Sequence, residues 1–591
     1  MIKFSIGQTG GPALCVAMWT LSKTAVSGQI GATRTNHPGL QEDGLSNQSS
    51  TGVSPSTRKK VSRRALFGLL LILGLSALLN TIVAIEASLT TDEGLHLKYG
   101  EQILKLEPDR VAFGFYDSQM PVSALNAAPL AVAHYLEARH QLSPLSSDVR
   151  LVLGRAPTIL ATLVLGLLVF FWAYDLYGES AAFASCLLCT LSPNLIANGT
   201  LVTTDMYHAV GVVGSLFFVR RFLLRPNWTH AVFAGLGLAV AQITKSFAVA
   251  LYFVVYIAIA CLMLRRTTQS PLTPKRVFDF TVVAAVCLVA VLNVAFCFDR
   301  PFRSLSSYHI PQVQTLPVLG HLPVPFPYPF LQGLVLMKQD EKAGASYGKI
   351  YLLGELRDSA DPTVRGFKSY YAVAYFYKEP IALQMLFLWG LVWVCRNRRL
   401  KDFIAGEGLL LMSGAILVVW FSFFSRAQIG IRHILPALAI ETIIAGAAFS
   451  KFPAKPWPQK AVLSVLVLWL AGSMASYYPQ MIPYMNEWLR DRRLSYRILA
   501  DSNLDWGQDA AVVSEFLRRN PEVVLDPKTP IAGRVLVRAN RLAGIYRGSS
   551  LVDLGKRHRP VAQVGYAHFL FDIPANDYVP PQMSNSSNST H

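Results

Sequence analysis

Long apolar runs separated by polar segments dominate the chain from Ala65 onward. A helix needs about 20 mostly apolar residues to cross the hydrocarbon core of a bilayer. The runs therefore predict membrane-spanning helices, and the shorter runs must extend into their flanks. Eleven such runs lie at residues 65–86, 152–174, 181–193, 206–224, 229–244, 246–264, 278–297, 380–395, 407–424, 433–450 and 461–480.

Three long polar segments interrupt or follow these runs, at residues 87–151, 298–379 and 481–591. The first places Leu95, Tyr99 and Ile103 on one helical face, which predicts an amphipathic helix in the membrane interface. The second is rich in proline and aromatic residues. The third contains strand-like runs at 534–537 and 561–571, which predict a small α/β region.

Together these patterns predict an all-α polytopic membrane protein with large loops on one side. The two ends are rich in small polar residues, which is typical of disordered tails. The predicted parts are a cytoplasmic tail ending in a basic stretch (1–64), a transmembrane domain (65–480), an outer C-terminal segment (481–574) and a second tail (575–591).

Composition supports a membrane location for most of the chain. Apolar residues make up 52% of the 591 residues and charged residues only 15%. A soluble protein usually has about a quarter of its residues charged. The seven cysteines fall mostly within apolar runs, so no disulfide framework is predicted.

The net charge of +18 would suggest nucleic-acid binding if the basic residues formed a surface patch. They instead lie in every second segment between the spans, on one side of the predicted membrane, which is the positive-inside pattern. No nucleic-acid partner is therefore expected. The short outer loops hold only Lys245, Arg426 and Arg432. The basic residues of the inner segments are Arg58, Lys59, Lys60, Arg63, Arg64, Arg220, Arg221, Arg225, Arg265, Arg266, Lys275, Arg276, Arg396, Arg398, Arg399, Lys401, Lys451, Lys455 and Lys460. This topology places the N-terminus in the cytoplasm and the three long segments outside.

Acidic, basic and amide side chains from distant parts of the chain converge on this outer face. Such clustering at a membrane interface predicts a functional site. The residues concerned are Asp92, Glu93, His96, Asn198, Asp205, Lys245, Arg426, Arg432, His433, Asn503, Asp505, Gln508 and Asp509.

Each candidate also has a purely structural interpretation. The adjacent carboxylates Asp92 and Glu93 could act as a general base or bind a cation, but they could equally cap a helix. Asp205 opens a span, where capping is the default role. Glu93 and His96 could form half of a metal site, although no second copy of the motif exists.

Four cations near the outer interface could hold a phosphate group. The alternative for each is that its side chain reaches toward lipid headgroups. These cations are Arg155, Lys245, Arg432 and His433.

Several common catalytic motifs are absent. The sequence has no Rossmann fingerprint, no GxSxG and no HExxH, and the stretch Gly344–Ile350 lacks the spacing and final Ser or Thr of a phosphate-binding loop. The energy for a reaction must then come with the substrate, and an activated lipid is the natural candidate.

The segments TTDEGLHLKYG, SPNLIANGTLVTTD, YYAVAYFYKEP, QIGIRHILP and ILADSNLDWGQD resemble the bacterial glycosyltransferase family 39 proteins. These are relatives of protein O-mannosyltransferases and of the lipid A aminoarabinose transferase. The resemblance runs from about residue 65 to about residue 574. It implies the GT-C fold, with many membrane helices and large non-cytoplasmic loops. It also implies transfer of a sugar from a polyprenyl-phosphate donor, usually with inversion. The first loop departs from the family pattern at MPVSALNAAP (120–129).

Carried onto this sequence, the resemblance implies Asp92 as catalytic base or metal-linked acid, with Glu93 beside it. Asp205 matches the second acidic position. A divalent cation, Mg²⁺ or Mn²⁺, would be held by these three acids, although no cofactor is required. The residues implied in substrate binding are His96, Arg155, Asp205, Lys245, Lys378, Arg432, His433, Asn503 and Asp505, of which Arg155, Lys378, Arg432 and His433 would contact the donor phosphate.

The sequence therefore favours a glycosyltransferase of the inner membrane with a periplasmic active site. Its expected partners are a polyprenyl-phosphate sugar donor, membrane lipids and a hydroxyl acceptor on a protein, lipid or glycan. The alternative is a carrier that translocates lipid-linked sugars without transferring them. A carrier would be expected to show half-chain repeats, broken spans and buried charges, and the sequence pattern indicates none of these.

Overall fold

The computed structural model describes residues 62–108, 119–265, 272–308, 310, 320–343, 348–359, 361, 363–364, 366–546 and 551–575. Most of both predicted tails lies outside these described residues. Val61–His591 forms one compact unit. The description below concerns that unit.

Every predicted span overlaps a helix. Within the described residues, seven helical segments are long and apolar enough to cross a membrane, and two bent helix pairs raise this number to nine. The seven are α2 (Arg63–Glu86), α5 (Ser147–Tyr177), α8 (Asp205–Leu224), η2 with α10 (Ser246–Leu264), α11 (Pro274–Ala295), the segment Ile431–Ala454 that contains η4, α19, η5 and η6, and α20 (Trp457–Ala475). The other two predicted spans correspond to the shorter helices α9 (Trp228–Gln242) and α18 (Glu407–Phe423). The chain is thus a multi-span helical membrane protein.

Two spans are bent, which the sequence pattern did not predict. Helix α6 (Glu179–Leu191) continues at 64° into α7 (Pro193–Gly199), and α15 (Tyr370–Lys378) continues at 109° into α16 (Ile381–Asn397). A proline opens α7 and another separates α15 from α16. Proline lacks the backbone N–H that a continuing helix needs, and it disfavours helical geometry in the residue before it.

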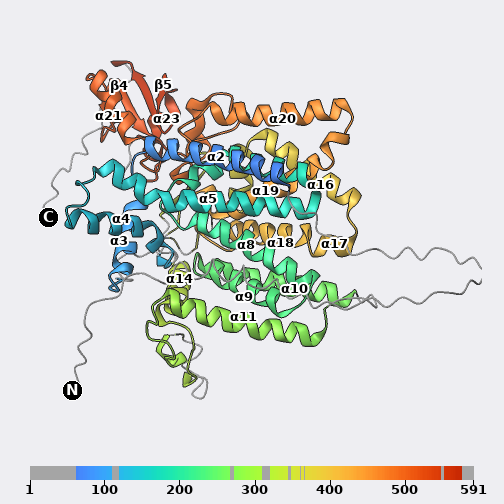
Figure 1. The fold of residues 1–591 in the computed structure, drawn as a ribbon. Helices are drawn as coiled ribbons and strands as arrows, with labels where there is room; N and C mark the ends of the chain where they lie inside the picture. The colour runs from blue at the N-terminus through green and yellow to red at the C-terminus, as the bar shows by residue number, and fades with distance from the viewer. Residues whose placement is uncertain are drawn as a thin grey trace, which may run out of the picture. The chain divides into compact units, whose positions relative to one another are not determined.

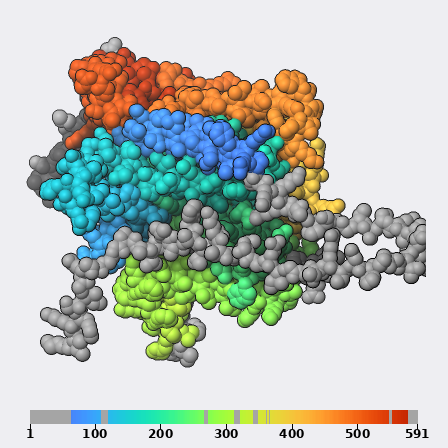
Figure 2. Space-filling model, viewed as in Figure 1, coloured from blue at the N-terminus to red at the C-terminus, as the bar shows by residue number. Residues whose placement is uncertain are grey.

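The smaller elements gather at the two ends of the long helices. Figure 1 shows α3 (Glu93–Leu104), α4 (Ser123–Ala138), α14 (Tyr328–Ala343) and the strands of the C-terminal region at one end. The short helix α17 (Leu400–Ile404) lies at the other. In the space-filling view of Figure 2, α2 lies beside α5 on the face that is drawn. The described parts of the three long segments thus lie at the same end of the long helices.

The C-terminal region contains the predicted small α/β structure. A four-stranded sheet has the order β3-β4-β6-β5, with β4 antiparallel to β6 and Val535 opposite Phe571. Its buried side chains pack against α21 (Ala510–Arg519) through Val513. A separate hairpin pairs β1 (Lys349–Leu352) with β2 (Glu355–Asp358). The strands of the larger sheet are β3 (Val524–Leu525), β4 (Gly533–Arg538), β5 (Ala562–Val564) and β6 (His568–Ile573). The short helices α22 (Ala539–Leu542) and α23 (Val552–Arg557) complete this region.

The contact between α16 and the Ile431–Ala454 segment depends on one glycine. A Cβ added at Gly390 would lie 2.1 Å from the carbonyl oxygen of Ile444, a backbone atom that cannot turn away. We expect Gly390→Ala to lower stability by about 1–3 kcal/mol, measured as thermal unfolding in detergent. Gly472→Ala on α20 is the matched control, because nothing lies within 4 Å of its added Cβ. Equal unfolding temperatures for the two variants would contradict this packing.

Candidate active site

A cavity of about 980 Å³ opens where the outer ends of several spans meet the polar segments. Asp92 and His96 enter it from the start of α3, and Asp205 from the first turn of α8. Arg432 and His433 come from η4 (Ile431–Ile434). Lys245 and Asp505 also line it, so seven of the eleven predicted site residues share one cavity.

A chain of alternating charges crosses this cavity. Arg432 donates to the Asp92 carboxylate at 2.9 Å, and its guanidinium lies 3.7 Å from Asp205. Lys245 Nζ donates to the other oxygen of Asp205 at 2.5 Å. Asp205 and Lys245 are buried, whereas the side chain of Asp92 is 30% exposed. Asp92 is therefore the solvent-accessible carboxylate in this chain of charges.

Neither acid has the helix-capping role that was its structural alternative. Asp92 occupies the N-cap position of α3, but its side chain makes no capping hydrogen bond and binds Arg432 instead. At α8 the N-cap position belongs to Thr204, and Asp205 is the first helical residue. Both carboxylates therefore form ion pairs across the cavity instead of hydrogen bonds that cap a helix.

Two buried nitrogens at the cavity have no hydrogen-bond partner among the described residues: Nε of Arg432 and Nε2 of His433. The guanidinium of Arg432 lies over the Trp506 ring, 4.1 Å from its centroid, and the His433 ring lies against Phe421. These aromatic contacts hold the two cavity side chains in place. A buried donor without a partner is unfavourable, and an anionic ligand would satisfy both.

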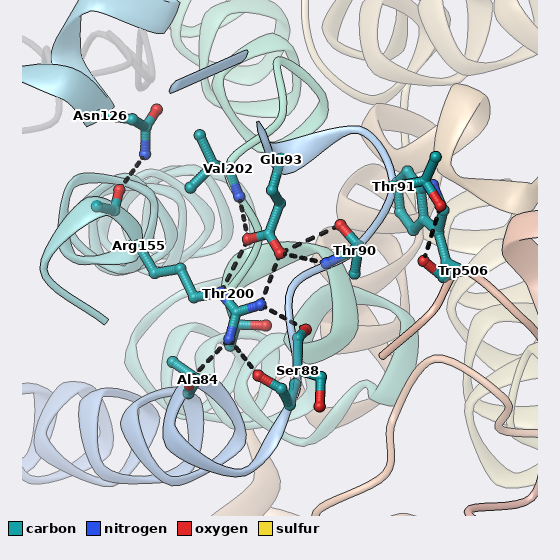
Figure 3. Close-up of polar contacts among 12 residues, drawn as sticks. Ala84, Ser88, Thr90, Thr91, Glu93, Asn126, Arg155, Thr200, Val202 and Trp506 are labelled. Carbon is teal, nitrogen blue, oxygen red and sulfur yellow. Dashed lines mark hydrogen bonds and ion pairs between the residues drawn. The ribbon is translucent and has the colours of Figure 1, made fainter. Parts of the chain in front are cut away.

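Glu93 lies in a different environment from its neighbour Asp92. It is fully buried and forms an ion pair with Arg155, which is also fully buried (Figure 3). Its two oxygens accept from Nε and Nη2 of Arg155 at 2.8 and 2.6 Å. They also accept from the backbone N–H and hydroxyl of Thr90 and from the N–H of Val202.

Arg155 is just as fully engaged. Its remaining N–H groups donate to the carbonyl oxygens of Ala84, Ala87 and Ser88 at the end of α2 (Figure 3). The pair therefore joins α2, α3, α5 and the segment before α8. Neither residue lines the cavity, so the structure does not place Glu93 or Arg155 where the sequence reasoning expected them.

Lys378 and Asn503 also lie outside the cavity lining. Lys378 is buried and donates to the carbonyl oxygens of Ile482 and Asn503 at 2.8 and 2.6 Å. The Asn503 side chain accepts from the N–H of Ile431 at 3.0 Å. These contacts fix the start of η4, and hence the backbone next to Arg432. Neither residue is placed to contact a donor phosphate directly.

His96 lines the cavity and lies 3.0 Å from the Ser123 hydroxyl through Nδ1. Burial lowers the pKa of His96 below its ordinary value, although the nearby Asp92 carboxylate opposes this effect. The imidazole is therefore neutral near pH 7 and can exchange a hydrogen bond without adding charge.

The three acids expected to hold a divalent cation do not form one cluster. No group of three or more His, Cys, Asp or Glu side chains within the described ranges could hold a metal ion. Arg432 forms ion pairs with both Asp92 and Asp205, and Arg155 engages both oxygens of Glu93. The divalent cation stays a prediction.

Asp501 was missed as a site residue although it lies within the ILADSNLDWGQD segment. It lines the cavity, and its pKa is raised to about 7, chiefly by burial. Repulsion from Asp92 and Asp505 adds to this effect, while Arg432 and the N–H of Ser502 oppose it. The sequence segment itself indicated a site, but it holds three acids within nine residues, Asp501, Asp505 and Asp509. The sequence did not indicate which of these acids faces the cavity.

The raised pKa of Asp501 predicts a pH-dependent stability. The folded protein holds this proton more tightly than the unfolded chain, so stability falls as pH rises from about 4 to about 7. Asp501→Asn removes the titrating group but keeps an oxygen for the Ser502 N–H. We expect the unfolding temperature of the variant to rise relative to wild type by a few degrees across this range.

Asp491→Asn provides a control that should be flat over the same range. A hydrogen bond from Arg493 lowers the pKa of Asp491 below its ordinary value, so this group is already ionised in both the folded and the unfolded chain above about pH 4 to 5, and the stability difference between the control and wild type should stay constant up to pH 7. Parallel pH profiles for wild type and Asp501→Asn would contradict the burial of this carboxyl group.

One wall of the cavity is apolar. It consists of side chains from η2 (Ser246–Val249), α10 (Ala250–Leu264), α14 and α18, namely Val249, Phe253, Leu334, Met337, Ile416, Val419, Trp420 and Phe424. Phe253 and Phe424 are 66% and 64% exposed, and both stand on or beside membrane spans. The cavity therefore joins a lipid-facing surface to the chain of charges formed by Asp92, Arg432, Asp205 and Lys245.

The family model for dolichyl-phosphate-mannose-protein mannosyltransferases matches residues 142–295. The match includes α5 to α11 and therefore Asp205 and Lys245. No curated protein matches the sequence. The family match supports the resemblance to GT-C glycosyltransferases and, in general terms, glycosyl transfer at a membrane.

Solved structures also show similarity. The chain is 13% identical to ArnT from Cupriavidus metallidurans bound to undecaprenyl phosphate, with a TM-score of 0.43, covering 87% of this chain and 99% of that one. It is 11% identical to the oligosaccharyltransferase AglB from Archaeoglobus fulgidus, in complex with an inhibitory peptide and a dolichol-phosphate, with a TM-score of 0.42, covering 75% of this chain and 59% of that one. Because both TM-scores are below 0.5, neither likeness bears on the function of the cavity.

Proposed function

We propose that this protein transfers a sugar from a polyprenyl-phosphate donor to a hydroxyl group of a protein, lipid or glycan. One observation carries the proposal: a single cavity joins an apolar, lipid-facing wall to a chain of charges that includes an accessible carboxylate. The matching family, whose members are described as dolichyl-phosphate-mannose-protein mannosyltransferases, is consistent with this class of donor.

The donor would bind with its polyprenyl chain along Phe253, Trp420 and Phe424. Its phosphate would then lie at the ends of the spans, where Arg432 and Lys245 supply positive charge. Guanidinium and ammonium groups bind phosphate strongly where water is excluded. The unpartnered Nε of Arg432 and Nε2 of His433 supply two further hydrogen-bond positions.

The Asp92 carboxylate is suited to accept the proton of the acceptor hydroxyl. The hydroxyl oxygen attacks the anomeric carbon of the sugar as the bond from that carbon to the phosphate oxygen breaks. The polyprenyl phosphate leaves with the bonding electrons, and Arg432 and Lys245 stabilise its growing negative charge. Attack opposite the leaving phosphate inverts the anomeric centre.

Arg432 links the two halves of this reaction. Its guanidinium donates to the Asp92 carboxylate at 2.9 Å. A donor phosphate would compete for the same guanidinium and would loosen its hold on Asp92. The carboxylate would therefore become available as a base when the donor is in place.

We further propose that the protein lies in the inner membrane with this cavity on the periplasmic side. The excess of Lys and Arg in the opposite loops supports this orientation.

The two bent spans and the buried carboxylates favour a second candidate function. Glu379 and Glu441 are both buried in or between spans, and one oxygen of each has no partner among the described residues. Broken helices and buried charges are features of carriers. A carrier of lipid-linked sugars would use the same cavity without the transfer step.

A donor screen tests the proposed function. Purified full-length protein is incubated with radiolabelled sugars on polyprenyl phosphate, with a membrane extract as the acceptor source. We expect label to move from one donor into an extract component. If no label moves from any intact donor while the protein remains folded, the transferase proposal fails and translocation of the donors becomes the next assay.

A further inference from the structure

Part of the cavity lining comes from the C-terminal region. We call this part the cap subsite, and it comprises Asp501, Asp505, Trp506, Asn540 and Tyr546. The first three come from the segment between α20 and α21, and Asn540 lies in α22. The proposed reaction gives no role to these residues.

The cap subsite carries two carboxylates that no basic side chain neutralises directly. Neither Asp501 nor Asp505 forms an ion pair with any residue that the structure describes. Asp505 is only 3% exposed, and its Oδ2 has no hydrogen-bond partner in the described part of the chain. A buried acceptor without a donor is unfavourable, and a ligand that supplies a donor removes this penalty.

Asn540 holds the two acidic turns in a fixed relation. Its Oδ1 accepts from the N–H of Asp501 at 2.7 Å, and its Nδ2 donates to the carbonyl oxygen of Asp505 at 2.9 Å. The N–H of Ser502 donates to Asp501 Oδ1 at 2.6 Å. The carboxylates are therefore pre-positioned rather than free to turn toward solvent, which is what a selective binding site requires.

Trp506 connects the cap subsite to Arg432, and thus to the chain of charges in the cavity. Its ring is in contact with the guanidinium of Arg432. Because Trp506 belongs to the cap subsite, a group covalently attached to a phosphate at Arg432 would lie next to this subsite. In a lipid-linked donor this group is the sugar.

We propose that the cap subsite binds the sugar of the donor through its hydroxyl hydrogens and discriminates against anionic sugars. This inference rests on the proposed function. Ionised carboxylates accept hydrogen bonds and donate none, so they match vicinal hydroxyl groups. A sugar carboxylate in the same position would face two like charges and would therefore bind more weakly.

The test compares donors that differ only at C6 of the sugar. Polyprenyl-phosphate glucose and glucuronic acid form one pair, and galactose and galacturonic acid form a second. Binding of each labelled donor to the purified full-length protein is measured at pH 8, together with polyprenyl phosphate that carries no sugar. We expect wild type to bind one hexose donor at least about tenfold more tightly than its uronic acid counterpart.

Asp505→Asn keeps the shape of the side chain but removes the charge. It should reduce this discrimination to within about threefold. Polyprenyl phosphate without a sugar should bind wild type and variant equally. Asp501→Asn should act in the same direction, and Asp491→Asn, whose side chain lies outside the cavity lining, should leave the ratio unchanged.

Several outcomes would overturn the inference. Undiminished discrimination in both Asp505→Asn and Asp501→Asn would show that these acids do not face the sugar. An equal loss of binding for polyprenyl phosphate alone would show that they act on the lipid or on folding. Binding is scored separately from transfer, so selective binding without transfer would reject the proposed function and leave the cap subsite standing. Sugar transfer without discrimination between hexose and uronic acid donors would support the proposed function and reject the cap subsite.

Discussion

Replacing Asp92 by Asn is expected to slow sugar transfer by about 10²–10⁴-fold. The variant keeps a side-chain oxygen for Arg432 but has no carboxylate to take the acceptor proton. The initial rate of label transfer from the active donor, per mole of folded protein, measures the effect. Membrane insertion and thermal stability should remain close to wild type, since the Asp92 side chain is partly exposed and caps no helix.

Asp491→Asn is a closely matched control for this substitution. The Asp491 side chain is also 30% exposed and pairs with Arg493 at 2.9 Å, the same exposure and distance as in the pair of Asp92 with Arg432. It does not line the cavity. The control should retain the wild-type rate. Full activity in Asp92→Asn would reject the base assignment, and equal losses in both variants would indicate a general effect of removing an outer carboxylate.

Replacing Arg155 by Met is expected to lower stability by about 3–5 kcal/mol, because it leaves the buried carboxylate of Glu93 without its counter-ion. It also leaves carbonyl oxygens at the end of α2 without donors. The unfolding temperature in detergent should fall markedly. Adding Glu93→Gln should recover part of the loss, because the double variant has no unpaired buried charge.

Arg150→Met on the same helix is the control for the Arg155 substitution. Arg150 pairs with Glu137 at 2.6 Å, but its side chain is 27% exposed. Breaking such a pair typically has an effect of about 0–1 kcal/mol. Equal destabilisation by the two substitutions, or no recovery in the double variant, would contradict a structural role for the Glu93–Arg155 pair.

The membrane-spanning architecture could be predicted from the sequence, because a span needs a long apolar run and such runs are visible in one dimension. The placement of the basic residues also predicted that the long segments share one side of the membrane, and which side this is stays a prediction. The small C-terminal sheet was also predictable from its strand-like runs: β4 covers the first predicted run, 534–537. The second run, 561–571, was predicted as one stretch but contains β5 and most of β6.

The roles of Asp92 and Glu93 could not be separated from the sequence. Successive residues at a helix start point about 100° apart, so one carboxylate faces the cavity and the other faces the protein interior. Which of them does so depends on Arg155, which is 62 residues away in the chain. The same reason applies to Lys378, whose burial against the Asn503 carbonyl oxygen arises only after the C-terminal segment has folded back.

The bends in two spans were also missed, and they weaken one argument made from the sequence. Unbroken apolar spans with few charges argue against a carrier, yet α15 meets α16 at 109° and Glu441 is buried within a span. A single proline at the end of an apolar run, as at Pro193 and Pro380, does not reveal the angle that results. The distinction between transferase and carrier must therefore come from the chemistry of the donor.

The most direct test of the central claim is a mass balance of the donor in proteoliposomes. Labelled polyprenyl-phosphate sugar is supplied with acceptor extract, and free polyprenyl phosphate, glycosylated acceptor and intact donor on each side of the membrane are measured together. The account predicts one polyprenyl phosphate released for each sugar transferred, with both products lost in Asp92→Asn. Intact donor that appears on the opposite side without any released polyprenyl phosphate would contradict it.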